Sequence, residues 1–148
     1  MRPILFRGKR QNKSGWVYGD LNQNDVHQGT SILENGCINN AVIKETVGQF
    51  VGLEDKNKKK IFEGDIVELN NKKTGLVFWG FWELSNEKGF CCWCSGGMAI
   101  SSYKNNPVAY SAKVIGNIFD NPELLTTEQR KIIELISETK LQEATNDT

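Results

Sequence analysis

The chain has 148 residues with 18 basic and 18 acidic side chains, so its formal net charge is zero. A neutral chain has no overall field to draw it to nucleic acid, and any such binding needs a local basic patch. Apolar residues make up 39% of the chain, enough for the core of one domain or of two small subdomains. The chain has no run of about 18 apolar residues, and its start does not resemble a signal peptide, so we expect a soluble cytoplasmic protein with no membrane partner.

Short apolar runs separated by polar turns predict β structure for the first third of the chain. Residues 2–7 and 16–18 are expected to pair as a hairpin. A polar segment follows, with one short strand at 32–33. Residues 37–43 predict a further strand, broken at Asn39–Asn40.

The centre of the chain predicts a strand, a turn and a second strand. Thr46 to Leu53 alternate as a strand does, and two glycines on one face, Gly48 and Gly52, indicate a bend or a close backbone approach. The turn after this strand contains Asn57, which we expect to adopt a positive φ in place of glycine.

The second half of the chain predicts more strands and then a helix. The strands are expected at 66–69, 75–84, 89–94, 98–102 and 113–119. Thr126 and Gln129 have the spacing of a capping box, so we expect an α-helix to begin there and to run to about Ala144.

The cysteines allow a zinc hypothesis. Cys91, Cys92 and Cys94 are neighbours, and Cys37 or His27 would supply the remaining ligand. On a strand, however, neighbouring side chains point to opposite faces, and the spacing does not give two separated pairs. We favour the alternative of reduced thiols packed as small apolar side chains, with no metal and no cofactor.

Glu63 and Asp65 flank Gly64 and would point to the same side of an extended chain, as a catalytic carboxylate pair does. The sequence places no histidine, metal or pocket beside them. The alternative that we favour is structural, with an Asp65 oxygen accepting hydrogen bonds from backbone donors of the turn. We therefore expect no catalytic residues.

Lysines gather in two predicted turns. They are Lys56, Lys58, Lys59, Lys60, Lys72 and Lys73. If both turns lie at one end of the fold, these lysines converge and, with aromatic rings nearby, favour nucleic-acid binding. The alternative is a solvated hairpin tip, because acidic residues dilute the charge: Glu54, Asp55, Glu63 and Asp65.

The densest aromatic cluster is Phe78–Trp82, and strand alternation places its rings on both faces of one strand. A small barrel buries only its inner face, so the outer face must be covered by another element or subunit. Together with an apolar stripe on the helix, this cluster predicts a homo-oligomer interface: Trp79, Phe81, Trp82, Ile132, Ile133 and Ile136.

Several spaced motifs carry a family resemblance: Ile4–Arg7, Gly15–Asp20, Val47–Leu53, Asp55–Asn57, Ile61–Val67 and Val114–Leu124. Together they resemble the YopX family of phage and prophage proteins. Lys58 departs from the family pattern, which usually has glycine after the asparagine. The resemblance implies a mostly β, intracellular, self-associating protein of no established activity, with no catalytic residues to transfer.

We therefore expect a mainly β fold of two small antiparallel β-barrel-like units with one C-terminal α-helix. The expected division is a β domain over residues 1–125, with subdomains at roughly 1–54 and 55–125, followed by the helix and tail over 126–148. The expected function is that of a non-enzymatic, phage- or prophage-encoded accessory protein that assembles with itself in the cytoplasm of the bacterial host. The alternative is a nucleic-acid-binding module that uses the lysine-rich turns.

Overall fold

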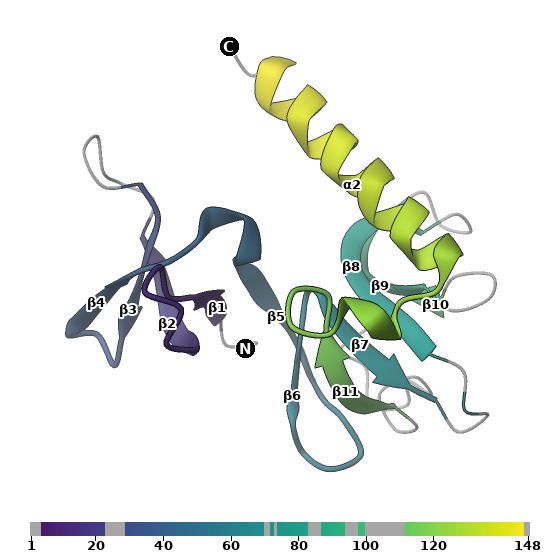
Figure 1. Ribbon diagram of the computed structural model, residues 1–148, viewed down its shortest axis with the longest axis horizontal. Coiled ribbons are helices and arrows are strands. Elements are labelled where there is room, and N and C mark those ends of the chain that lie inside the picture. The colour runs from purple at the N-terminus through teal and green to yellow at the C-terminus, as the bar shows by residue number, and fades with distance from the viewer. Residues whose placement is uncertain are drawn as a thin grey trace.

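The computed structural model describes residues 4–22, 29–69, 72, 74–82, 87–93, 98–99 and 112–146. These residues form two antiparallel β-sheets that lie side by side and one C-terminal α-helix (Figure 1). The expected mainly β fold is confirmed at this level. Within the described ranges neither sheet closes on itself, so the barrel-like units stay a prediction.

The first sheet has the strand order β4-β3-β2-β1-β5-β6. Its strands are β1 (Phe6–Lys9), β2 (Trp16–Asn22), β3 (Ser31–Glu34), β4 (Ile38–Ala41), β5 (Gly48–Glu54) and β6 (Lys60–Phe62). The predicted hairpin is confirmed by the antiparallel pairing of β1 with β2. The predicted break at Asn39–Asn40 is wrong, because both residues pair with β3. Asn39 is exposed, whereas the half-buried Asn40 side chain accepts from the Arg10 guanidinium at 3.3 Å and donates to the Ile38 carbonyl at 3.1 Å.

The second sheet has the strand order β10-β9-β8-β7-β11. Its strands are β7 (Asp65–Glu68), β8 (Thr74–Trp82), β9 (Glu87–Trp93), β10 (Met98–Ala99) and β11 (Lys113–Asn117). Of the strand predicted at 98–102, only its first two residues lie in the described ranges, and both are in β10. The strand predictions for this half are otherwise confirmed to within a few residues at each end.

The chain passes from the first sheet to the second at Glu63–Gly64. The strand before this point, β6, pairs with β5 in the first sheet and was not predicted as a separate strand. Gly64 has a φ of 94°, a conformation that glycine adopts at little cost. Its N–H donates to the Val77 carbonyl at 2.8 Å, and its carbonyl accepts from the Ile118 N–H at 2.9 Å. The predicted domain division at about residue 54 stays a prediction, since sheet membership does not define a folding unit.

Two apolar clusters form the core. The smaller belongs to the first sheet and contains Val17, Ile32 and Val42. The larger contains Val51, Ile61, Val67, Leu69, Val77, Ala112 and Val114. Because Val51 and Ile61 come from β5 and β6, the far end of the β5–β6 hairpin packs in the core of the second sheet.

The helix α2 (Thr127–Asn146) begins at the predicted capping box. The Thr126 N–H donates to the Gln129 side chain at 3.0 Å, and the Gln129 N–H donates to the Thr126 hydroxyl at 3.1 Å. The Gln129 side chain is buried and also donates to the Thr74 carbonyl at 3.2 Å, which fixes the first turn of α2 to β8. In the part of the chain that the structure describes, no helix is long and apolar enough to cross a membrane.

The turn between β5 and β6 has the three-residue form in which a β-turn is followed by a left-handed residue. The Lys58 N–H donates to the Asp55 carbonyl at 2.9 Å, and the Asp55 N–H donates to the Lys59 carbonyl at 2.7 Å. The left-handed residue is Lys58, with a φ of 65°, so the prediction that Asn57 adopts a positive φ is wrong. The turn places its strained position one residue later than the sequence suggested.

We expect Lys58→Gly to stabilise the protein by about 0.5–1 kcal/mol, because glycine adopts the left-handed conformation without the steric cost of a β-carbon. The measurement is the midpoint of urea denaturation. The matched control is Lys56→Gly, which removes the same charge from the same turn at a position without a positive φ and should give no gain. Equal effects of the two substitutions would contradict this assignment of strain.

Candidate functional site

Four exposed lysines surround the turn between β5 and β6. Lys56, Lys58, Lys59 and Lys60 are all exposed, and we call this segment the lysine turn. Asp55 organises it from inside: one carboxylate oxygen accepts from the Asn57 N–H at 2.8 Å and from the Lys59 N–H at 2.9 Å. The lysine side chains therefore project from a backbone held by the buried acid at its base.

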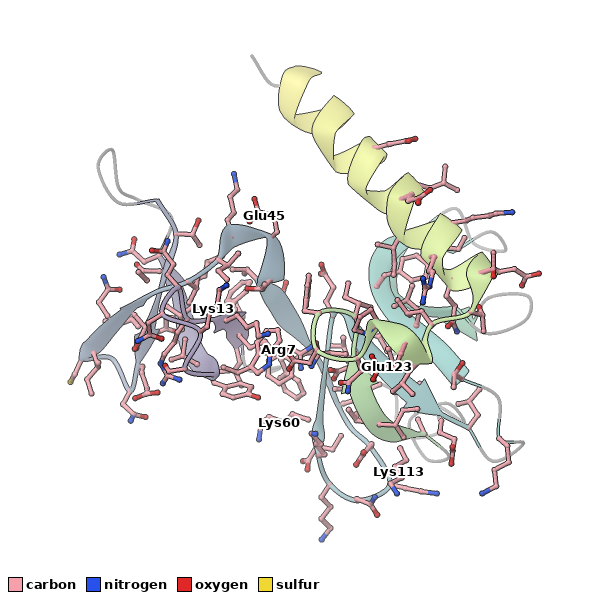
Figure 2. All side chains as sticks on the ribbon, viewed as in Figure 1. Arg7, Lys13, Glu45, Lys60, Lys113 and Glu123 are labelled. Atoms are coloured by element: carbon pink, nitrogen blue, oxygen red, sulfur yellow. The ribbon has the colours of Figure 1, made fainter. Side chains whose placement is uncertain are left out.

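Two further lysines lie at the same end of the second sheet. Lys113 opens β11 opposite Glu68 at the end of β7, and the Lys72 N–H donates to the Leu69 carbonyl at 2.9 Å just beyond it. The lysine turn joins this end, because the Lys56 N–H donates to the Ala112 carbonyl at 3.0 Å. Figure 2 shows Lys60 and Lys113 on this side of the molecule. We call the lysine turn together with Lys72 and Lys113 the lysine end.

The convergence of the two turns is therefore observed for the described lysines. Lys73 lies outside the described residues. Lys113 was not predicted, because nothing in the sequence places the start of β11 beside a turn more than fifty residues earlier. Its position follows from strand pairing alone.

Two of the acidic residues expected to dilute this charge are buried. Asp55 is only 6% exposed and Asp65 only 1% exposed, so their carboxylates are turned away from solvent. Glu54 is exposed and sits opposite Lys60 in the hairpin register. Burial acts to raise the pKa of Asp55, but hydrogen bonds from the backbone N–H groups of Val114, Lys59 and Asn57 hold this pKa below its usual value.

The predicted roles of the aromatic residues near the lysines are tested only in part. Trp79, Phe81 and Trp82 lie on β8, but their side chains are outside the described set, so their predicted roles stay predictions. An exposed ring that was not predicted is Tyr18 on β2, at 46% exposure. Tyr18 contacts Phe62, which in turn contacts Phe50.

Of the two interpretations of Glu63 and Asp65, a catalytic pair or a structural turn, the contacts of Asp65 support the structural one. One Asp65 oxygen accepts from the Phe62 N–H at 2.7 Å, as expected for a turn aspartate. The other forms an ion pair with Arg7 at 2.7 Å, and both side chains are almost fully buried. Burial raises the pKa of Asp65, and the Arg7 charge opposes that shift. A carboxylate that is buried and held in this way is not open to a substrate from solvent.

Arg7 lies at the junction of the two sheets (Figure 2). No role was predicted for it from the sequence. Its guanidinium lies 4.7 Å from the centre of the Trp16 ring and 5.0 Å from that of Phe62. It also donates to the Glu63 carbonyl at 3.4 Å. Two aromatic faces, a carboxylate and a carbonyl replace most of the water that the charge loses on burial.

A second contact between the sheets is centred on Asp120, in the turn after β11. Its carboxylate accepts from the Trp16 indole N–H at 2.7 Å and pairs with Lys9 at 2.5 Å. The Lys9 and Trp16 interactions lower the pKa of Asp120 to about 2. The turn itself is shaped by Asn117, whose side-chain oxygen accepts from the Phe119 N–H at 3.0 Å and from the Asp120 N–H at 2.9 Å.

The zinc hypothesis is not decided. Cys94 and His27 lie outside the described residues, and the side chains of Cys91 and Cys92 are not described either. Cys37 is a free, exposed thiol at the turn between β3 and β4. Among the residues that the structure describes, no group of three or more His, Cys, Asp or Glu side chains has the geometry to hold a metal ion.

Of the three isoleucines predicted to form the helical interface, the structure describes the side chains of the first two. Ile132 and Ile133 are half-buried, and the side chain of Ile136 is not described. Leu135, which was not among the predicted interface residues, is 57% exposed.

We expect Arg7→Met to destabilise the protein by about 3–5 kcal/mol, because it leaves the Asp65 carboxylate buried without its partner. Combining Arg7→Met with Asp65→Asn should recover part of this loss, since it removes the unpaired charge and keeps an acceptor for the Phe62 N–H. The control is Lys9→Met in the same strand, which breaks the more exposed pair with Asp120 and should cost under about 1 kcal/mol. Urea denaturation measures all three. Equal costs for Arg7→Met and Lys9→Met would show that the buried pair has no special weight.

The family model described as YopX protein matches residues 5–126. No curated protein matches the chain. The matched range contains every strand of both sheets and ends at Thr126, the cap of α2. The chain therefore belongs to the YopX family.

Proposed function

We propose that this protein is a phage- or prophage-encoded accessory protein that acts by binding rather than by catalysis and assembles with itself in the bacterial cytoplasm. Membership of the YopX family supports this proposal. So does the buried state of Asp65, which removes one half of the carboxylate pair that an acid–base mechanism would use.

The observation that carries self-assembly is the direction of α2. Figure 1 shows the helix leaving the second sheet at its first turns, with its C-terminal part extending beyond both sheets. Helices of this length gain most of their stability from packing an apolar face, not from propensity alone. Ile132 and Ile133 are only half-buried, and the stripe that they form with Ile136 is the face that we propose for that packing.

A second copy of the chain is the occupant that we propose for this face. The chain has no net charge, so two copies approach each other without long-range repulsion. The helices would then bury their isoleucine stripes against each other. Trp79, Phe81 and Trp82 on β8 are the proposed extension of the same interface.

We expect the full chain to elute from a sizing column with the light-scattering mass of a closed oligomer. Replacing Ile132, Ile133 and Ile136 with alanine should weaken association by at least about tenfold, because it removes apolar contact area while keeping helix propensity. The matched control replaces the exposed Glu128, Glu134 and Glu138 with alanine and should leave the mass unchanged. A monomeric full chain, or equal masses for both triple variants, would remove α2 from the proposal.

The lysine end supports nucleic-acid binding as a second candidate function. Six exposed lysines from three separate segments meet there. Such a cluster gives a local positive field on a neutral chain, and phosphate contacts by lysine account for most non-specific affinity. Because Asp55 and Asp65 are buried, their carboxylates do not compete with phosphate for direct contact with the lysines.

We expect the protein to bind oligonucleotides with an affinity that falls steeply as salt rises. Replacing Lys56, Lys59 and Lys60 with alanine should reduce the slope of log affinity against log salt by about 2, because three phosphate contacts at roughly 0.7 each are lost. The matched control removes three exposed lysines elsewhere, Lys13, Lys44 and Lys131, and should leave the slope intact. Fluorescence anisotropy measures both. Equal slopes would show that the affinity reflects overall charge and not this end of the molecule.

A further inference from the structure

Tyr18 is an exposed aromatic ring in a fixed position. It lies on β2 directly opposite Arg7 of β1, and 46% of the residue is exposed. Its ring packs against the buried Phe62 with centroids 5.4 Å apart and an interplanar angle of 59°. A half-exposed ring that packs against a buried neighbour has already lost part of its side-chain freedom, so it can stack on a further group at a smaller entropic cost.

A row of contacts joins this ring to the lysine turn. Phe62 contacts Phe50 at 5.7 Å between centroids, and the Lys60 ammonium lies 6.0 Å from the centre of the Phe50 ring. Phe50 and Phe62 are directly paired in the sheet and so share a face. The exposed ring and the first lysine of β6 are therefore the two ends of one aromatic row on the same face of the first sheet.

An exposed ring joined to a lysine cluster through a row of aromatic contacts has a defined chemical preference. Single-stranded nucleic acid offers phosphates to the cations and the faces of its unpaired bases to the ring. Duplex DNA offers the same phosphates, but its bases are stacked on each other and present no free face. An acidic polypeptide offers charge alone.

We infer that the lysine end binds single-stranded nucleic acid, with the lysines on the phosphates and Tyr18 stacked on one base. This inference rests on the second candidate function above. It adds that the ligand is single-stranded and that Tyr18 is the residue that contacts an unpaired base. Because every base has a π face, the interaction selects unpaired strands and not a particular sequence.

The test compares a labelled oligo-dT with a duplex of the same length, by fluorescence anisotropy at low salt. Tyr18→Leu keeps an apolar side chain against Phe62 but removes the π face, and Tyr18→Phe keeps the π face. We expect Tyr18→Leu to weaken single-strand binding by about 5- to 100-fold, with duplex binding unchanged and Tyr18→Phe close to the unmodified chain. Ile38→Ala, at an exposed apolar residue on the edge strand β4, is the control and should change neither.

The other outcomes are separable. A chain that binds neither probe contradicts nucleic-acid binding itself, and this inference fails with it. Equal binding of single strand, duplex and poly-glutamate shows a general polyanion surface and overturns the inference about strand state. Preference for the single strand that survives Tyr18→Leu overturns the role of Tyr18 alone.

Discussion

The arrangement of the two sheets depends on the ion pair between Arg7 and Asp65. Arg7 belongs to β1 in the first sheet, and Asp65 is the first residue of β7 in the second. Burying two such charges costs several kcal/mol for each ion, which only good geometry and further polar partners can offset. Here the Phe62 N–H and the Glu63 carbonyl provide those partners, and both belong to the segment that crosses between the sheets. The crossing and the ion pair therefore stabilise each other.

Gly64 occupies the centre of this junction for a steric reason as well as a conformational one. A β-carbon there would lie 3.6 Å from the Phe119 ring and 3.7 Å from an Arg7 guanidinium nitrogen, and the φ of 94° would still be unfavourable. The neighbouring turn that contains Phe119 also brings Asp120 to Trp16, whose ring covers Arg7. Residues far apart in the sequence thus meet at one place.

Local patterns in the sequence predicted local structure well. The β1–β2 hairpin, the capping box of Thr126 and Gln129, and the turn role of Asp65 all depend on residues close in sequence, and all are observed. What failed were choices between neighbouring positions: the left-handed residue of the turn is Lys58, where a long side chain stands in a position that suits glycine. Hydrogen bonding by Asp55 holds the turn in that form regardless of which residue bears the strain.

Contacts between residues far apart in the sequence were harder to predict, and this limited the prediction of the site. Charge pattern predicted that lysines gather, but Lys113 joins them only through the pairing of β11 with β7. Likewise, Tyr18 alternates in β2 as any strand residue does, and its exposure depends on the packing of the first sheet around Phe62. No periodicity within one segment contains that information.

The protein has no net charge, but around the lysine end its acidic and basic side chains are separated in space. Asp55 and Asp65 turn inward, where backbone N–H groups and Arg7 satisfy them, while the lysines beside them in sequence point outward. At physiological salt a charge is screened beyond about 8 Å, so a ligand at the lysine end responds to nearby lysines and not to the acidic residues of α2. The same hydrogen bonds that fold the hairpin around Asp55 thus leave lysine ammonium groups, and not this carboxylate, at the surface. In this hairpin the backbone's need for buried acceptors decides which charges reach the surface, and net charge is a poor guide to that.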